Sequence, residues 1–345
     1  MMMTLTALLL VALALGGGWL WTPDKPRADL EARYAGPPSE FIEAAGLRLH
    51  VRQSGPLAAQ GAPSAQSNQP VIILLHGFGS SLHTWEPWAE KLAATHRVIR
   101  LDLPGAGLTG ADPKGDYSDL RGEQILAALM DHLGIAQATL VGHSMGGRLA
   151  WRFAAEQPSR VDKLVLVAPD GFASPGFEYG KAPEVMPAVR LMQHVLPKSL
   201  LRMSLAPAYA NPGRMTDETI TRYHDMMLAP GVRTALIARM QQLVLQDPVP
   251  FLRRIQAPTL LLWGEQDAMI PVANAQDYLR AMPNARLVVI AGVGHLPHEE
   301  TPAESLPALL GFLASLASLA GPRQVHTANV SGYESERTAE RPIGR

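Results

Sequence analysis

The feature that most constrains the fold of this chain is a series of short, continuous apolar runs. The first, Val71–Leu75, has no polar position at which one face of a strand could meet water. Such a run is typical of a strand that is buried on both faces of a parallel sheet. Further runs of this kind lie at residues 98–101, 138–141, 164–168, 259–263 and 287–290. Helical patterns, for example at 120–133 and 148–156, separate most of them, and this alternation predicts an α/β fold with a mostly parallel sheet flanked by helices.

The apolar runs share one stretch of the chain, and we expect a single α/β domain over residues 39–320. Two short strands before residue 53 predict a hairpin at its start. Residues 53–70 are rich in Gly, Pro, Ser, Ala and Gln and lack periodicity, which predicts a flexible surface insertion. We expect residues 22–38 to be a linker before the domain and the polar residues 321–345 to be a disordered tail.

The N-terminal residues 1–21 carry no charged side chain and consist mainly of Leu, Ala and Val. The run is long enough to cross a bilayer as a helix, which takes roughly 20 residues, and Trp19 and Trp21 at its end fit an interfacial anchor. A cleaved export signal is the alternative, with the difference that no Lys or Arg precedes the apolar stretch. Lys25, Arg27 and Arg33 follow the stretch, which favours a cytoplasmic body, whereas an export signal would place the body outside. We expect membrane association through this one segment, on a side that the sequence leaves open.

The alternation lapses over residues 171–250, where prolines break several short helical patterns. This insertion lies between the runs at 164–168 and 259–263, so it would cover the carboxyl ends of the strands, where open α/β sheets bind ligands. Half of the chain's 14 methionines fall in it, namely Met186, Met192, Met203, Met215, Met226, Met227 and Met240. Methionines at helical spacing pack in a core more often than they form a binding surface, and both interpretations stay open here. Because flexible methionine side chains repack around acyl groups at small cost, we expect a helical lid with an apolar inner wall.

A serine lies where a predicted strand turns directly into a predicted helix. The sequence there is Gly142-His143-Ser144-Met145-Gly146, and G-x-S-x-G between a strand and a helix is typical of a nucleophile elbow. The backbone of such an elbow is strained and leaves no room for β-carbons two residues to either side, which accounts for the two glycines. We therefore expect Ser144 to be a nucleophile.

A serine nucleophile needs a base that removes its proton and an acid that orients the base. Asp267 follows the apolar run at 259–263, and His295 follows the run at 287–290. Because Ser144, Asp267 and His295 each lie just past the carboxyl end of a strand, they can meet at one edge of the sheet. Asp170 is the rival acid and His298 the rival base.

The backbone amides of Phe78 and Met145 are the expected oxyanion hole. Phe78 belongs to His76-Gly77-Phe78-Gly79, directly after the run Val71–Leu75, and Met145 follows the nucleophile. Backbone N–H groups held beside a nucleophile stabilise the negative oxygen that develops during acyl transfer. Since only the backbone N–H groups take part, this role does not require a particular side chain at either position.

These motifs, together with Asp102-Leu103-Pro104-Gly105-Ala106-Gly107, resemble the α/β-hydrolase superfamily in its lidded serine esterase branch, which includes monoacylglycerol lipases and carboxylesterases. The resemblance covers roughly residues 41–320. It implies the α/β-hydrolase fold, a triad of Ser144, His295 and Asp267, and a bracing role for Asp102. Members of the superfamily that open epoxides or cleave carbon–halogen bonds carry Asp at the nucleophile position, so Ser144 argues against both activities.

The charge balance and the residue types of the chain exclude several other classes of function. Lys and Arg number 30 against 31 Asp and Glu, so the chain lacks the basic surface expected of a nucleic-acid-binding protein. It has no cysteine and no H-E-x-x-H spacing, and we expect neither a metal site nor a cofactor. We expect a serine hydrolase that cleaves carboxylic esters, chiefly lipophilic acyl esters, through an acyl-enzyme. Carbon–carbon bond hydrolysis or perhydrolysis on the same triad stays open, as does a binding protein without catalysis.

Overall fold

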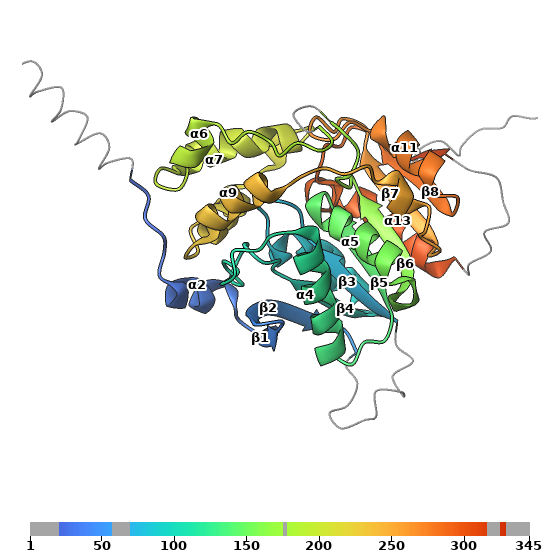
Figure 1. Ribbon diagram of the computed structural model, residues 1–345, viewed down its shortest axis with the longest axis horizontal. Coiled ribbons are helices and arrows are strands. Elements are labelled where there is room, and N and C mark those ends of the chain that lie inside the picture. The colour runs from blue at the N-terminus through green and yellow to red at the C-terminus, as the bar shows by residue number, and fades with distance from the viewer. Residues whose placement is uncertain (1–20, 57–69, 175–177, 316–324, 329–345) are drawn as a thin grey trace, which may run out of the picture.

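The computed structural model describes residues 21–56, 70–174, 178–315 and 325–328, and a central sheet dominates it (Figure 1). Its strands are β1 (Ser39–Ala44), β2 (Leu47–Ser54), β3 (Val71–Leu75), β4 (Arg97–Leu101), β5 (Ala138–His143), β6 (Val161–Val167), β7 (Thr259–Gly264), β8 (Ala285–Ile290) and β9 (Val325–Ala328). They form a nine-stranded sheet in the order β1-β2-β4-β3-β5-β6-β7-β8-β9. β2 pairs antiparallel with β1 and with β4, and the other neighbouring pairs are parallel. The predicted α/β fold is therefore confirmed, and each of the six apolar runs contributes a strand.

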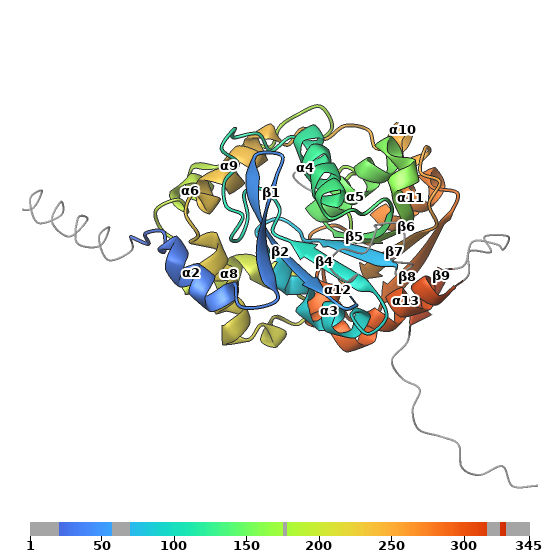
Figure 2. The ribbon, with the colours of Figure 1, turned by 90° about the horizontal axis from the view of Figure 1, so that it is seen from below.

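Helices cover both faces of this sheet, as the continuous apolar runs require. Figure 2 shows α3 (Glu86–Leu92), α12 (Pro297–Glu300) and α13 (Pro302–Ala314) on one face, opposite α4 (Asp119–His132), α5 (Met145–Glu156), α10 (Val249–Leu252) and α11 (Asn274–Ala281). Side chains alternate along a strand, so Ile72 and Leu74 pack with Trp88 of α3 on the first face. Ile73 and Leu75 point the other way and pack with α4 and α5.

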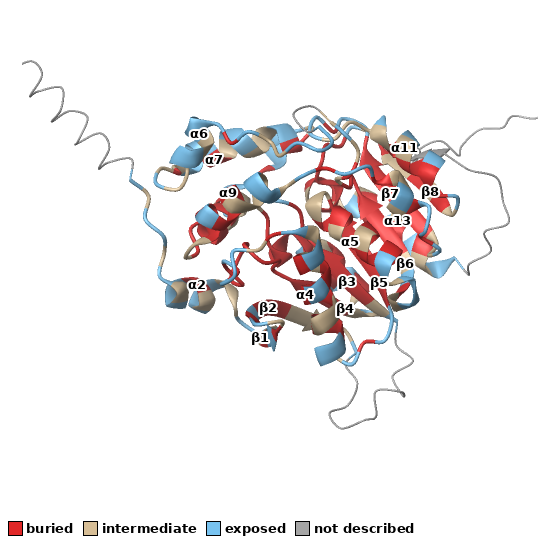
Figure 3. Ribbon diagram, in the orientation of Figure 1, coloured by how far each residue is buried: buried red, intermediate tan, exposed pale blue. Residues whose placement is uncertain are grey.

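The expected lid lies between β6 and β7. It contains α6 (Pro187–Leu191), α7 (Lys198–Leu205), α8 (Asp217–Met227) and α9 (Val232–Gln242). Figure 3 shows much of α6 and α7 exposed, in contrast to the buried sheet. Met226 and Met227 of α8 are buried in a cluster with Leu30, Tyr223 and Leu236. The lid thus has an apolar core of its own.

The expected linker at residues 22–38 is wrong in part, because it contains the helix α2 (Arg27–Tyr34). Leu30 of this helix is 2% exposed and packs into the lid core. Three donors of the same segment converge on the buried carboxylate of Asp225 in α8: Lys25 Nζ at 2.6 Å, Arg33 Nη1 at 3.1 Å and the Tyr34 hydroxyl at 2.7 Å. The segment is therefore docked onto the lid, and these contacts, rather than its own weak apolar pattern, stabilise the helix.

The expected disordered tail at 321–345 also differs from the structure in part. Residues 325–328 form β9, which pairs in parallel with β8 at the edge of the sheet. An edge strand adds hydrogen bonds along one side only, so its sequence needs no long apolar run. The rest of that tail, the apolar residues 1–20 and most of the insertion at 53–70 lie outside the described residues. Within the described part of the chain, no helix is long and apolar enough to span a bilayer.

Candidate active site

Ser144 occupies the sharp turn between β5 and α5. Its φ of 51° and ψ of −117° place it in a strained backbone region for a residue with a side chain. A β-carbon at Gly142 would lie 2.3 Å from the Gly146 carbonyl oxygen, and one at Gly146 would lie 2.3 Å from the Leu75 carbonyl oxygen. Only glycine fits at either position, and the turn holds the serine at the carboxyl end of the sheet.

His295 and Asp267 lie at the same edge of the sheet and are bonded to each other. The Nδ1 atom of His295 is 2.7 Å from Oδ2 of Asp267. The other carboxylate oxygen accepts the amide N–H groups of Met269 at 2.9 Å and Ile270 at 2.8 Å. The carboxylate is thus fixed by the loop after β7, and it holds the imidazole through Nδ1, while Nε2 makes no hydrogen bond with a described residue.

Ser144 and His295 line one cavity of about 460 Å³ between the sheet edge and the lid. The serine hydroxyl makes no hydrogen bond to His295 among the described residues, a separation that is common before substrate binds. Phe78 and Met145, the two expected oxyanion positions, line the same cavity. The lid contributes Met240 as its one cavity-lining methionine among the described residues, while Met226 and Met227 pack elsewhere.

The loop after β3 approaches the elbow closely enough to present its amides there. A β-carbon at Gly77 would lie 3.2 Å from the Ser144 β-carbon. Met145 is the first residue of α5, and the first amides of a helix have no acceptor within it. His76 braces the loop: its Nε2 accepts the Leu103 N–H at 2.9 Å and its Nδ1 lies 2.8 Å from the Gly77 oxygen. Burial lowers the pKa of His76, so the ring is neutral while it makes these two bonds.

The two rivals of the predicted triad have other partners. The Asp170 carboxylate lies 3.7 Å from Arg148 and makes no hydrogen bond to His295 among the described residues. Burial raises the pKa of Asp170, and Arg148 opposes that rise in part. His298 is fully buried, with its Nε2 3.1 Å from the Thr84 hydroxyl and its ring stacked on Trp85 at 4.1 Å. Burial holds its pKa well below the usual range, as expected of a packing residue.

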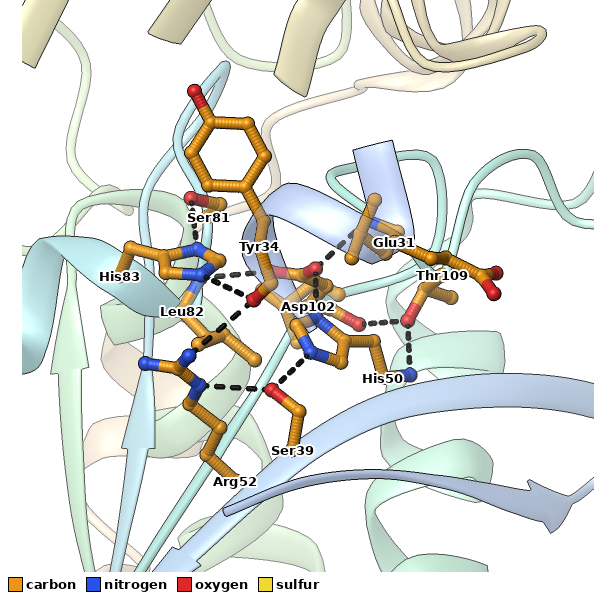
Figure 4. Close-up of polar contacts among 12 residues, drawn as sticks. Glu31, Tyr34, Ser39, His50, Arg52, Ser81, Leu82, His83, Asp102 and Thr109 are labelled. Carbon is orange, nitrogen blue, oxygen red and sulfur yellow. Dashed lines mark hydrogen bonds and ion pairs between the residues drawn. The ribbon is translucent and has the colours of Figure 1, made fainter. Parts of the chain in front are cut away.

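A second Ser-His-Asp set lies away from this cavity, and sequence reasoning missed it. The Nδ1 atom of His50 is 2.7 Å from Asp102, and its Nε2 is 2.9 Å from the Ser39 hydroxyl (Figure 4). Asp102 also accepts the amides of Leu82 at 2.7 Å and Leu108 at 2.8 Å. It therefore ties β2 and the segment of Leu82 to its own loop after β4, which agrees with its expected bracing role. Ser39 does not line the cavity that holds Ser144, so we assign this set to the scaffold.

The lid touches the loop that carries His295. The His295 N–H donates to the Ala208 carbonyl oxygen of the lid at 2.8 Å. Gly294 packs so tightly there that a β-carbon would lie 2.6 Å from the Ala210 nitrogen. Glu300 extends the contact by accepting the amides of Asn211 at 2.8 Å and Gly294 at 2.8 Å.

No described group of three or more His, Asp or Glu side chains is arranged to hold a metal ion. Several arginines line the cavity instead, among them Arg148 from α5 and Arg239 from α9. Neither residue belongs to a recognisable motif, and single arginines in helices carry no local signal that could have marked them.

Comparisons with known proteins agree with this fold. A family model described as the alpha/beta hydrolase fold matches residues 70–302. A 2-hydroxy-6-oxo-6-phenylhexa-2,4-dienoate hydrolase from Burkholderia cepacia is 30% identical over 259 residues, covering 72% of this chain and 85% of the relative. Among solved structures, a bacterial membrane phospholipase A matches with a TM-score of 0.65 at 23% identity, covering 90% of this chain and 97% of that one. A meta-cleavage product hydrolase from Pseudomonas fluorescens IP01 matches with a TM-score of 0.66 at 22% identity, covering 79% and 97%.

The two solved structures are less than 25% identical and show the fold alone. The family model and the Burkholderia relative each cover about two thirds of the chain or more, and they show the family. The match spans β3, the elbow, the lid and the loop of His295, which are the parts that form the cavity. The chain belongs to the α/β-hydrolase family, and it is a hydrolase.

Proposed function

We propose that this protein is a serine hydrolase that cleaves carboxylic esters of lipophilic acyl groups. The observation that carries the proposal is the strained Ser144, which lines one cavity with His295, whose Nδ1 is bonded to Asp267. A nucleophile, a base and an orienting acid in this relation are the requirements of acyl transfer. The apolar side chains Leu103, Leu149, Met240, Leu243 and Ile270 line the cavity and suit a hydrocarbon chain.

Under this proposal each residue of the triad has one role. His295 takes the proton of Ser144 through Nε2 as the serine oxygen attacks the acyl carbonyl, and Asp267 stabilises the imidazolium that forms. The amides of Phe78 and Met145 bind the developing oxyanion, and each such donor is worth about 10²–10³ in rate. His295 then gives the proton to the leaving alcohol. Water attacks the acyl-enzyme with His295 again as base, and the acid is released.

The first prediction tests the nucleophile against a control serine from the second Ser-His-Asp set. Ser144→Ala is expected to lower kcat on nitrophenyl acyl esters by several orders of magnitude and to abolish labelling by a fluorophosphonate probe, because triad members act as a unit. Ser39→Ala is expected to keep both. Labelling of the Ser144→Ala variant, or loss of labelling in Ser39→Ala alone, contradicts the proposal.

We further propose that the protein works at a membrane through the apolar residues 1–20. Trp21, where the described chain begins, stacks on His194 of the lid with ring centroids 5.0 Å apart. The neighbouring lid helices expose further large apolar side chains, namely Met186, Leu191, Leu200 and Met203. An apolar lid face beside the end of a charge-free segment suits contact with lipid.

Carbon–carbon bond hydrolysis on the same triad is the second candidate, favoured by the 30% identical relative that is named a dienoate hydrolase. The discriminating measurement is turnover of nitrophenyl acyl esters compared with that of a vinylogous diketone. Faster turnover of the diketone would replace the ester proposal with this one.

A further inference from the structure

Among the described residues that line the cavity of Ser144, one cationic side chain, Arg239, makes no ion pair. Besides Arg239, three arginines line it, and each has a carboxylate oxygen within 2.7 Å. These pairs are Arg121 with Asp112, Arg148 with Asp119, and Arg152 with Glu123. Among the described residues, no carboxylate lies within ion-pair distance of Arg239.

Arg239 is nevertheless held firmly in one position. It lies in the last turn of α9, and its Nη2 donates to the Pro104 carbonyl oxygen at 2.6 Å. The guanidinium carbon lies 5.1 Å from the centre of the Tyr117 ring, a cation–π distance. Its Nε and Nη1 atoms make no hydrogen bond with a described residue, so donors remain for a ligand in the cavity.

Arg239 is only partly buried, and Tyr117 and Asp119 favour its charge, yet burial still outweighs them. Burial lowers the pKa of Arg239 to about 10, which expresses the lost hydration of the charged form. The group still carries its charge at neutral pH, and one neutral carbonyl oxygen does not satisfy five donors. A residue that merely linked α9 to the loop of Pro104 would not need a charge, whereas a site for an anion would.

We propose that Arg239 binds a negatively charged group on the substrate, a carboxylate or a phosphate, while the ester carbonyl lies at Ser144. The inference rests on the proposed function, since Ser144 defines where the ester lies. The two residues line the same cavity, Ser144 from the turn between β5 and α5 and Arg239 from helix α9 of the lid. The apolar side chains Leu103, Leu149, Met240 and Leu243 line it as well, so a substrate with an apolar middle and a charged end matches the wall.

Two matched pairs of substrates separate the sources of such a charge. A nitrophenyl monoester of glutarate and the nitrophenyl ester of valerate differ by a carboxylate on the acyl side. An acylglycerol phosphate and the corresponding monoacylglycerol differ by a phosphate on the alcohol side. The variants are Arg239→Gln, Arg239→Lys and, as a control on the exposed lid surface, Arg190→Gln, with melting temperatures measured for each.

Arg239→Gln is expected to lower kcat/KM on the charged member of at least one pair by about tenfold to a hundredfold, mainly through KM, because hydrogen bonds to charged groups are worth this much. The neutral members should change little, Arg239→Lys should restore part of the loss, and Arg190→Gln should behave as wild type. The pair that responds identifies the side that carries the charge. Equal losses on charged and neutral members of both pairs, or no loss on any, would overturn the inference.

A binding measurement keeps this test separate from ester hydrolysis. Monomethyl glutarate and glycerol phosphate are titrated into Ser144→Ala and into Ser144→Ala with Arg239→Gln. Binding of either probe that depends on Arg239 supports the anion site even if esters prove to be poor substrates. Hydrolysis of neutral esters together with binding that ignores Arg239 would leave the proposed function standing and refute the anion site.

Discussion

Asp267 and Asp170 both follow strands at the edge of the sheet, but only one is built to hold an imidazole. Asp267 is 7% exposed and accepts two backbone amides on the oxygen that does not face His295. Those two bonds hold the carboxylate in place independently of its contact with the imidazole. The Asp170 carboxylate faces Arg148, which is bonded more closely to Asp119 at 2.6 Å. Arg148 therefore keeps a partner when Asp170 is neutralised.

The second prediction follows at this scale. Asp267→Asn is expected to lower kcat by about 10⁴, because an amide no longer stabilises the imidazolium and favours the wrong tautomer. Asp170→Asn is expected to change kcat far less, since its amide does not touch the base. Initial rates on one ester at saturating substrate compare the two variants directly. A larger loss in Asp170→Asn would move the acid to the loop after β6.

The residues of the elbow could be predicted from sequence because their chemistry is local. Gly142, Ser144 and Gly146 lie within five positions, and one turn explains all three. The proposed role of Arg239 could not be predicted from sequence, because it depends on whether the fold brings a carboxylate close enough to form an ion pair with the guanidinium. The set of Ser39, His50 and Asp102 could not be predicted for the same reason. Its members come together only because β1 pairs with β2 and the loop after β4 lies beside them.

At the scale of elements, α2 is a helix that depends on its neighbours. Eight residues form few helical hydrogen bonds of their own, and an isolated helix of this length is unstable in water. Leu30 in the lid core and the contacts to Asp225 supply the missing stability. Burial alone would raise the pKa of Asp225, but the hydrogen bonds from Lys25 and Tyr34 outweigh it and lower that pKa. The carboxylate thus contributes stability above its unfolded pKa of about 4, and the contribution is lost as the pH falls through the lower folded value.

The third prediction concerns the docking of this helix. Leu30→Ala is expected to cost about 2–5 kcal/mol of unfolding free energy and to speed tryptic cleavage after Arg27 and Arg33, because it leaves a cavity in the lid core. Leu310→Ala on α13, where the side chain is 39% exposed, removes the same atoms from the surface and serves as the control. Denaturant unfolding and a proteolysis time course measure both. Equal behaviour of the two variants would mean that α2 is not held by Leu30.

The strands of the sheet were predictable, whereas α2 and β9 were not, for the same physical reason. A strand buried on both faces must be apolar at every position, and that requirement is visible in Val71–Leu75. A short docked helix needs one apolar side chain, and an edge strand needs partners along one side alone. Both requirements are met by ordinary polar sequence, which looks like a linker or a tail.

For the molecule as a whole, the described contacts hold the residues that follow the apolar N-terminal segment against the lid. The Thr22 N–H donates to the His194 carbonyl oxygen at 2.8 Å, and Asp24 pairs with Arg233 of α9 at 2.6 Å. A truncation that keeps these contacts should leave the structure of the lid unchanged. A truncation that also removes α2 should expose the lid core.

The fourth prediction uses these two truncations. Full-length protein is expected to sediment with lipid vesicles, whereas protein lacking residues 1–20 is expected to stay in the supernatant and to hydrolyse short esters at nearly the full rate. Protein lacking residues 1–34 is expected to lose stability as well, because Leu30 and the partners of Asp225 are gone. Uncleaved full-length protein recovered without detergent and without vesicle binding would remove the membrane proposal.

The hydrogen bond between His295 and Ala208 has a consequence for how such an enzyme can change during evolution. Under the proposed function, the backbone that positions the general base His295 is bonded to the insertion that would select substrates, so a mutation that moves one also moves the other. A lid transplanted from a relative would bring a new specificity and, unless it rebuilt the carbonyl at position 208 and the amides that meet Glu300, a misplaced imidazole. New substrate ranges are therefore more accessible through changes in α9 and the residues after it, which line the cavity and lie far along the chain from that junction.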